Sequence, residues 1–297
     1  MNKKKVLVIM NPKAGRQQAN RVLTEILETF SRAGYVPTVL LTTLPKSAID
    51  LTIQNAAGHD MAVAIGGDGT LREVVSSLIA AEIDLPVGYI PAGSTNDFSR
   101  ALNLSLNPVK AAADIVNGHE ESIDLMSLND EVYTYVASFG AFTKASYETP
   151  QSAKNALGHS AYIAAALKGL SDIRPFHLRL EHDSTVYEED FIFGSFSNAT
   201  SIGGFLKMNE NDVDLKDGKF EVLLVKNTKN IFDLVEMAAG ISNMDYSNDN
   251  LVFFSADKVT ISADPNMDWT LDGEYCKGQQ DVTISILPKR LRIILPS

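Results

Sequence analysis

The sequence is poor in cysteine and in long apolar runs. Cys276 is its only cysteine, which excludes an internal disulfide and is typical of a reducing compartment. No apolar stretch approaches the roughly 18 residues that a membrane-spanning helix needs. The basic start of the chain leads into only five apolar residues before Asn11-Pro12, which indicates a buried first strand rather than a signal peptide. We therefore expect a cytoplasmic protein.

Positive charge is also scarce. The 37 Asp and Glu outnumber the 26 Lys and Arg, and the net charge is −11. Because nucleic acids and anionic lipids are bound by basic surfaces, this balance argues against broad nucleic-acid binding and against purely electrostatic attachment to membranes. The five histidines show no metal-ligand spacing, which argues against a zinc site.

Two hydrophobicity patterns divide the 297 residues into two expected domains. In residues 1–125, short apolar strands alternate with helical stretches, which predicts an α/β domain with a doubly wound parallel sheet. In residues 126–287, most segments are strand-like and several alternate apolar with polar residues, which predicts a mainly β domain, antiparallel and sandwich-like. The apolar stretch within 288–297 is expected to complete the first domain as a further strand.

The boundaries of the expected elements follow from the same patterns. In the first domain the strands are 6–10, 37–42, 62–65 and 87–90, and the helices are 18–33, 47–57, 71–81 and 95–102. In the second domain the strands are 122–128, 132–139, 176–182, 186–198, 220–226, 252–263, 267–271 and 282–287, and the helices are 160–173 and 230–241.

Three strands of the first domain are followed by loops with unusually little side chain. These loops are Asn11-Pro12-Lys13-Ala14-Gly15, Gly66-Gly67-Asp68-Gly69-Thr70 and Pro91-Ala92-Gly93-Ser94-Thr95-Asn96-Asp97. Because the carboxyl ends of parallel strands meet at one edge of a sheet, the loops should gather where such folds bind ligands. Missing side chains let backbone N–H groups approach an anion, and a following helix N-terminus favours negative charge. The pattern predicts a phosphate site.

Asp68 is the exception within this phosphate site, because a bare carboxylate repels phosphate. Its presence makes sense if Mg²⁺ lies between the carboxylate and the phosphates, and Asp97 could serve the same ion. The alternative is a tight turn in which Asp68 caps a helix, a reading that three such loops on one sheet make weaker. The chain lacks a P-loop motif, and it lacks G-x-G-x-x-G after its first strand, so we expect neither a P-loop nor a Rossmann dinucleotide site.

These loops, together with Glu73, resemble the catalytic domain of the diacylglycerol kinases, a superfamily that includes sphingosine and ceramide kinases. The resemblance continues through three later segments and covers essentially the whole chain. These segments are Ser146-Tyr147-Glu148-Thr149-Pro150, Asp214-Leu215-Lys216-Asp217-Gly218-Lys219-Phe220 and Leu271-Asp272-Gly273-Glu274. Gly-Gly-Asp-Gly alone is shared with NAD kinases and phosphofructokinases, but the order and spacing of all segments are most similar to soluble bacterial diacylglycerol kinases.

The resemblance implies an ATP-binding first domain and a β-rich second domain, with the active site in a cleft between them. The positions that would hold ATP are Asn11, Pro12, Lys13, Ala14, Gly15, Thr42, Gly67, Asp68, Gly69, Thr70, Leu71, Arg72, Glu73 and Ser94. Two positions, Asp68 and Asp97, would bind Mg²⁺ through water. A structural Mg²⁺ would be held by Asp217 with the main-chain carbonyls of Asp214 and Lys219.

The resemblance also places a catalytic base in the Asp-Gly-Glu stretch without deciding between Asp272 and Glu274, and Asp68 is the third catalytic candidate. A carboxylate there can accept the proton of an acceptor hydroxyl during phosphoryl transfer. The alternative for both Asp217-Gly218 and Asp272-Gly273 is a simple turn, since Asp-Gly is a leading turn signal.

We therefore expect a lipid kinase of phospholipid metabolism that transfers the ATP γ-phosphoryl, with Mg²⁺, to diacylglycerol and gives phosphatidic acid. It would act peripherally on the inner membrane surface, without a nucleic-acid partner, and a homodimer is a candidate assembly. The alternatives are a kinase for a sphingoid base or phosphatidylglycerol, an NAD-kinase-like enzyme, and a non-catalytic nucleotide-binding regulator. The regulator is disfavoured because all the candidate carboxylates are present.

Overall fold

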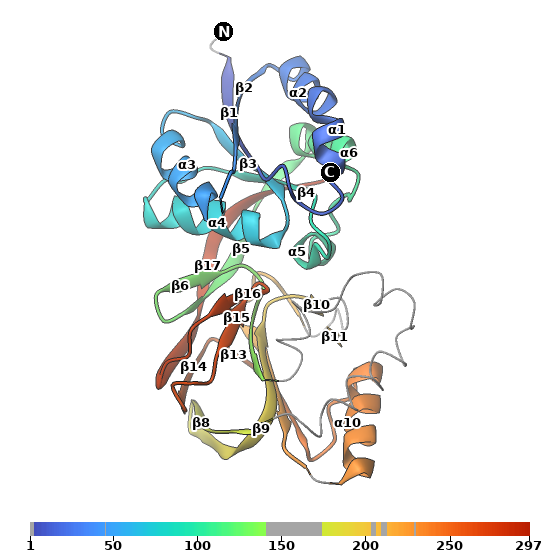
Figure 1. The fold of residues 1–297 in the computed structure, drawn as a ribbon, viewed down its shortest axis with the longest axis vertical. Coiled ribbons are helices and arrows are strands. Elements are labelled where there is room, and N and C mark those ends of the chain that lie inside the picture. The colour runs from blue at the N-terminus through green and yellow to red at the C-terminus, as the bar shows by residue number, and fades with distance from the viewer. Residues whose placement is uncertain (1–2, 45, 141–173, 203–205, 209–212, 229) are drawn as a thin grey trace. The chain divides into compact units, whose positions relative to one another are not determined.

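The computed structural model describes residues 3–44, 46–140, 174–202, 206–208, 213–228 and 230–297 (Figure 1). The chain forms two compact units, which we call unit 1 (Met1–Ile123 with Lys289–Ser297) and unit 2 (Asp124–Pro288). The strands β5 (His119–Leu128) and β17 (Asp281–Leu295) contribute residues to both units. Among the described residues, no helix has the length and apolarity needed to cross a membrane.

Unit 1 is built on a parallel sheet with the strand order β17-β4-β3-β1-β2. The four strands that lie wholly in this unit are β1 (Lys4–Met10), β2 (Tyr35–Leu41), β3 (Met61–Gly66) and β4 (Val87–Pro91). Every residue of β3 and β4 is buried, as expected for strands that are covered on both faces.

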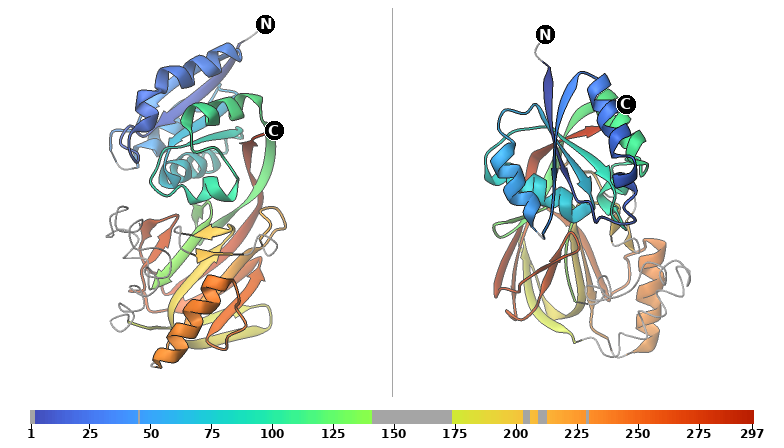
Figure 2. Two further views of the ribbon diagram at one scale, coloured as in Figure 1. Left: turned by 90° about the vertical axis from the view of Figure 1, so that its right-hand side faces the viewer. Right: turned by 45° about the horizontal axis from the view of Figure 1, so that its top comes forward.

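Helices cover both faces of this sheet (Figures 1 and 2). The helices are α1 (Gln18–Arg21), α2 (Leu23–Arg32), α3 (Ser47–Asn55), α4 (Asp68–Ala80), α5 (Asp97–Ala101) and α6 (Pro108–Asn117). On one face α2 packs against α6, and on the other α3 packs against α4. Alternate strand residues such as Val8, Val63 and Ile90 form one buried cluster with α2 and α6. The doubly wound α/β arrangement is confirmed.

Three helices of unit 1 differ from their expected form. The stretch expected as one helix over 18–33 is two helices, because Val22 leaves helical geometry at φ −114°, ψ 16°. Helix α4 begins at Asp68, three residues earlier than expected, so the second glycine loop is shorter than the sequence suggested. Helix α6 was not expected, although Asn107 caps it by accepting hydrogen bonds from the N–H groups of Val109 and Lys110, both at 3.0 Å.

Unit 2 is a mostly antiparallel β structure centred on the long strand β9 (Thr185–Ser197), which pairs with β7, β8 and β12. The other elements used below are β6 (Glu131–Tyr133), β7 (Val136–Gly140), β8 (Phe176–His182), β12 (Phe220–Lys226), α10 (Ile231–Asn243), β13 (Leu251–Ala256), β14 (Lys258–Ala263), β15 (Trp269–Leu271) and β16 (Glu274–Cys276). Trp269 lies at the centre of the core, with its ring 5.2 Å from that of Phe139 and 5.6 Å from that of Phe196.

Several expected strands of unit 2 are divided or joined. The stretch 132–139 is two strands because the chain turns at Thr134-Tyr135, and 252–263 is interrupted at Asp257. The stretch 282–287 and the final apolar stretch form one continuous strand, β17. The expected helix over 160–173 lies outside the described residues, whereas the helix expected over 230–241 is α10.

Candidate functional site

The three glycine loops of unit 1 meet at the carboxyl edge of its sheet. The N–H of Asn11, which follows β1, donates to the carbonyl of Ile65 at 2.8 Å. The N–H of Ala92, which follows β4, donates to the carbonyl of Gly66 at 2.7 Å. The N–H of Thr42 donates to the Met10 carbonyl at 2.9 Å, which places the end of β2 at the same edge. The strand order therefore brings together four segments that lie far apart in the sequence.

The glycines of these loops allow backbone to pack on backbone. A Cβ atom on Gly93 would lie 2.6 Å from the Cα of Gly67 and 2.7 Å from Oδ1 of Asn96. A Cβ on Gly15, whose φ is +49°, would collide with the carbonyl oxygens of Ala92 and Gly93. The sequence argument assigned the missing side chains to an approaching anion. In the structure, Gly15 and Gly93 are required by the contacts between the loops themselves.

Asp68 and Asp97 are both buried, and each is the first residue of a helix. Asp68 is 8% exposed and Asp97 is 1% exposed. Oδ2 of Asp68 accepts a hydrogen bond from the backbone N–H of Asp97 at 3.1 Å, and Oδ1 accepts one from the hydroxyl of Tyr89 at 3.3 Å. A carboxylate is stabilised at a helix N-terminus by the helix dipole, which favours both positions. The structure therefore concentrates negative charge between the second and third loops.

Tyr89 is a residue of this site that the sequence did not reveal. It lies on β4, is 1% exposed, and reaches Asp68 through its hydroxyl. Burial and the neighbouring carboxylates of Asp68 and Asp97 raise the pKa of its phenol well above 10, so the hydroxyl stays protonated and acts as a donor. A single tyrosine in an apolar strand carries no distinguishing signal in a sequence.

The other expected ATP residues have varied surroundings. Asn11 closes a turn, since its Oδ1 accepts from the N–H of Lys13 at 2.9 Å. Glu73 accepts hydrogen bonds from the N–H groups of Lys46 and Ala48 at the start of α3, both at 3.2 Å. The side chain of Leu71 is completely buried, so only its backbone could face a ligand. Pro12, Ala14, Gly69, Thr70, Arg72 and Ser94 lie in the same loops or in the first turns of α4.

The acidic charge of the chain is concentrated in unit 2. Residues 124–288 contain 25 Asp and Glu against 12 Lys and Arg, whereas the rest of the chain contains 12 acidic residues against 14 Lys and Arg. Unit 1 is therefore close to neutral. The net charge of −11 does not oppose the binding of a polyphosphate to its loops.

In unit 2, Asp272 holds together the turn between β6 and β7. Its carboxylate accepts hydrogen bonds from the backbone N–H groups of Thr134, Tyr135 and Val136 at 2.7, 2.9 and 3.1 Å. It also accepts one from the hydroxyl of Thr134 at 2.8 Å. The residue is 5% exposed. Because its carboxylate is buried and engaged with the turn, Asp272 is poorly placed to meet an approaching hydroxyl.

Glu274 differs from Asp272 in exposure. It begins β16 and pairs with Leu271 across the two-residue turn Asp272-Gly273, and its side chain is exposed. The left-handed backbone of Asp272, at φ +51°, and of Gly273, at φ +85°, forms this turn and directs the chain back. Of the two carboxylates that the sequence could not separate, only Glu274 is open to an approaching hydroxyl.

The expected metal segment 214–219 is a turn that precedes β12. Oδ1 of Asp214 accepts from the N–H of Lys216 at 3.0 Å, and Oδ1 of Asp217 accepts from the N–H of Lys219 at 2.9 Å. The N–H of Gly218 donates to Oδ2 of the buried Asp124 at 2.8 Å. Asp124 anchors the turn from β5, and its place inside an expected strand concealed it in the sequence.

Strand pairing brings the Asp272–Glu274 turn and the 214–219 turn to the same end of the unit 2 sheet. Leu271 pairs with Ala137 on β7, and β7 pairs with β9. Ser197, at the end of β9, is paired with Glu221 at the start of β12. Within the described residues, no three His, Cys, Asp or Glu side chains gather as a metal cluster, so a cation here would need backbone carbonyls as ligands.

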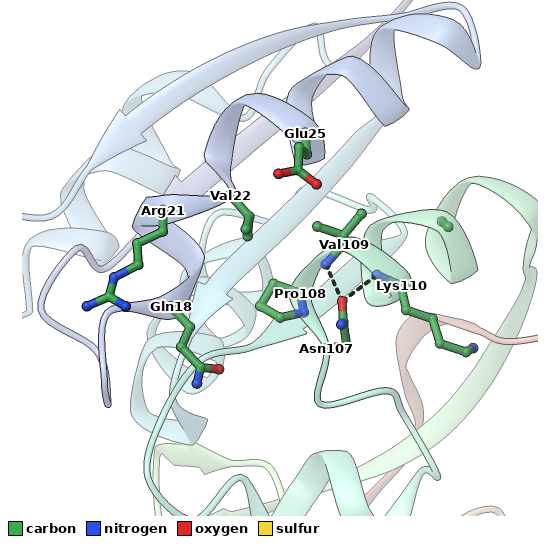
Figure 3. Close-up of a pocket in the computed structure, with 9 residues that line it drawn as sticks. Gln18, Arg21, Val22, Glu25, Asn107, Pro108, Val109 and Lys110 are labelled. Carbon is green, nitrogen blue, oxygen red and sulfur yellow. Dashed lines mark hydrogen bonds between the residues drawn. The ribbon is translucent and has the colours of Figure 1, made fainter.

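A groove of about 660 Å³ lies elsewhere on unit 1, between α1–α2 and the start of α6 (Figure 3). Its polar lining includes Arg21, Glu25 and Lys110. Lys110 forms an ion pair with Asp114 at 2.8 Å. None of the residues expected to bind ATP or metal lines this groove, so we assign it no part in the candidate site.

Comparison with known proteins addresses both units. The family model described as "Diacylglycerol kinase catalytic domain" matches residues 5–128, and that described as "YegS C-terminal NAD kinase beta sandwich-like domain" matches residues 136–295. A diacylglycerol kinase of Bacillus subtilis (strain 168) is 30% identical over 92% of this chain and 90% of its own. That of Staphylococcus carnosus (strain TM300) is 29% identical over 99% of this chain and 96% of its own.

The chain belongs to the diacylglycerol kinase family. A crystal structure of a putative diacylglycerol kinase from Bacillus anthracis str. Sterne has a TM-score of 0.80, with 24% identity, over 99% of this chain and 96% of that one, and so confirms the fold. Membership of a kinase family implies ATP and typically a divalent metal. The family segment 146–150 lies outside the described residues, whereas the other family segments lie in the loops and turns described above.

The contact between the second and third loops makes one glycine indispensable. We expect Gly93→Ala to lower the free energy of unfolding by about 1–3 kcal/mol, because its Cβ would press on the Gly67 backbone. Gly67→Ala is the matched control, since its Cβ would lie 3.4 Å from the Gly93 Cα and its φ of −87° suits any residue. Urea denaturation measures the free energy of unfolding of both variants. Equal stability of the two variants would contradict the packing argument.

The four hydrogen bonds of Asp272 predict a structural role. We expect Asp272→Asn to lower the free energy of unfolding by about 2–4 kcal/mol. The neutral amide replaces one charged acceptor oxygen with an N–H₂ group, which is itself a donor and faces backbone N–H donors. Asparagine tolerates the left-handed backbone of this residue, so the change isolates the carboxylate. Wild-type thermal stability in Asp272→Asn would show that the carboxylate does not hold the turn.

Proposed function

We propose that this chain is an ATP-dependent lipid kinase that transfers the γ-phosphoryl group of ATP to the free hydroxyl of diacylglycerol and forms phosphatidic acid. The observation that carries the proposal is the family match across both units, with relatives named diacylglycerol kinase that align over most of their length. Diacylglycerol is a membrane lipid, so the reaction takes place at a membrane surface. We assign it to the cytoplasmic face, where ATP is available.

The carboxyl edge of the unit 1 sheet is the proposed ATP site. Backbone N–H groups at the starts of α4 and α5 offer donors to the phosphates, and the helix dipoles favour negative charge there. The Thr70 and Ser94 hydroxyls and the cations of Lys13 and Arg72 lie in the same segments. Such a site works by positioning and by charge stabilisation, which is what phosphoryl transfer chiefly requires.

The residues present fit a divalent cation. Asp68 and Asp97 supply the hard oxygen ligands that Mg²⁺ prefers. The hydrogen bond from the Asp97 N–H to Oδ2 of Asp68 keeps the two residues adjacent, which suits an ion that keeps several waters. In unit 2 the carbonyl of Asp214 accepts a long hydrogen bond of 3.4 Å from the N–H of Asp217. A carbonyl oxygen has two lone pairs, so it can also serve as a cation ligand. We propose Asp217, with the carbonyls of Asp214 and Lys219, for a structural Mg²⁺. Bound at the phosphates, Mg²⁺ neutralises charge that develops during transfer.

Glu274 is the proposed catalytic base, and Asp272 is assigned to holding the adjacent turn. Glu274 accepts the proton of the diacylglycerol hydroxyl while that oxygen forms a bond to the γ-phosphorus and the bond to the β,γ-bridging oxygen breaks. The products are phosphatidic acid and ADP. Exposure of Glu274 and the four hydrogen bonds of Asp272 support this division of roles.

A substrate panel tests the proposed function. The protein is incubated with γ-labelled ATP, Mg²⁺ and, separately, diacylglycerol in mixed micelles, sphingosine, phosphatidylglycerol and NAD. We expect label in phosphatidic acid. Label in another lipid, or only in NAD, would identify that compound as the acceptor in place of diacylglycerol. The absence of label from every product would favour a nucleotide-binding regulator.

The proposed base predicts a change in rate without a change in stability. We expect Glu274→Gln to lower kcat by about 10²–10⁴-fold, the usual contribution of a general base, with the KM for ATP little changed. Because Glu274 is exposed, the melting temperature of the Glu274→Gln variant should match that of the wild type. Glu236→Gln, on the exposed side of α10, is the matched control and should keep full activity. A Glu274→Gln enzyme with normal kcat would rule out this base.

A further inference from the structure

The hydroxyl of Tyr89 lies among three acceptors inside unit 1. It is 3.3 Å from Oδ1 of Asp68, 3.3 Å from the carbonyl oxygen of Gly66 and 3.5 Å from Oδ1 of Asn96. These oxygens belong to the second and third glycine loops and to the last residue of β3. Tyr89 lies on β4 and is 1% exposed, so its hydroxyl is shielded from bulk solvent.

The hydroxyl of Tyr89 has one proton to donate, and the Asp68 carboxylate is the strongest of the three acceptors. The carbonyl of Gly66 already accepts from the N–H of Ala92 at 2.7 Å, and Oδ1 of Asn96 accepts from the N–H of Gly93 at 2.9 Å. Asp68 carries a charge, and hydrogen bonds to charged acceptors are roughly twice as strong as neutral ones.

Tyr89 and the Asp97 backbone therefore hold the two oxygens of Asp68 from different sides. Oδ2 is fixed by the N–H of Asp97 and Oδ1 by the hydroxyl of Tyr89. With both oxygens held, the plane of the carboxylate is set before any ligand arrives. A carboxylate offers about four lone-pair sites, so these two hydrogen bonds do not by themselves exhaust its acceptor capacity.

The strand itself does not require a hydroxyl at this position. Tyr89 pairs with Ala64 on β3, which leaves room for a ring, and Ile90 beside it belongs to the apolar cluster on the opposite face. A phenylalanine would fill the same space. The hydroxyl is the one polar addition to an otherwise apolar strand, and its nearest charged partner is Asp68.

We propose that Tyr89 is a positioning residue that orients the Asp68 carboxylate for the divalent cation of a bound metal–nucleotide. This inference rests on the proposed function for the identity of the ligand. It assigns Tyr89 no contact with the substrate: the residue acts through Asp68. Loss of the hydroxyl removes this hydrogen bond and weakens the orientation of the carboxylate, so metal-dependent affinity falls while the lipid acceptor is bound as before.

The test compares Tyr89→Phe with Tyr133→Phe by isothermal titration with ADP at a series of Mg²⁺ concentrations and with ADP in EDTA. Tyr133 is also completely buried, and its hydroxyl has no hydrogen-bond partner among the described residues, so it controls for removal of a buried hydroxyl. We expect Tyr89→Phe to weaken Mg²⁺-dependent ADP binding about 3–10-fold, the range for the loss of one hydrogen bond of ordinary net strength. Binding in EDTA should be unchanged, and Tyr133→Phe should match the wild type throughout.

A double-mutant cycle then connects the effect to Asp68. In an Asp68→Asn background, Tyr89→Phe should cause a much smaller further loss of Mg²⁺-dependent affinity, because the two side chains act as one unit. In the kinase assay we expect Tyr89→Phe to raise the Mg²⁺ concentration for half-maximal rate by a similar factor, with the KM for diacylglycerol unchanged.

Two results would overturn the inference. One is a Tyr89→Phe variant that melts at a lower temperature but binds Mg²⁺ and ADP like the wild type, which would reduce the hydroxyl to a structural role. The other is an equal loss in the Asp68→Asn background. Failure of the wild type to phosphorylate diacylglycerol would contradict the proposed function only, because the binding measurements need no acceptor.

Discussion

The contact between the backbones of Gly67 and Gly93 is the constraint on which the candidate ATP site depends. A Cβ at residue 93 would lie 2.6 Å from the Cα of Gly67, so the second and third loops can meet only if residue 93 has no side chain. Their contact sets the starts of α4 and α5 beside each other, and with them the carboxylates of Asp68 and Asp97. Gly93 thus acts through protein packing.

The carboxylates of the molecule fall into two physical classes. Asp68, Asp97, Asp124 and Asp272 are buried, and backbone N–H groups donate to Asp68, Asp124 and Asp272. These hydrogen bonds fix the orientation of the three carboxylates, which suits metal binding or the anchoring of a turn. Glu274 is exposed, which suits a group that exchanges a proton with a substrate. The number of acidic residues in a motif does not separate a structural or metal-binding carboxylate from one that exchanges a proton. The burial of each carboxylate and the N–H groups that donate to it do separate them.

The acidic charge of the chain is distributed unequally between the two units. Most acidic residues lie in unit 2, so the unit that carries the glycine loops is close to neutral. A net charge of −11 for the whole chain therefore says little about the surroundings of a bound polyphosphate. Long-range electrostatics depends on where charges lie, and a total hides a division between two units.

The sequence predicts the α/β and β-rich fold classes and most strands, because apolar periodicity follows directly from burial on one face or two. It also located the three glycine loops, since strand order requires them to share an edge. Only the tertiary structure separated Asp272 from Glu274, because their difference arises from the amides at residues 134–136, more than a hundred residues away in the chain. It alone revealed Tyr89, whose role depends on a neighbour across the sheet edge and not on its place in β4.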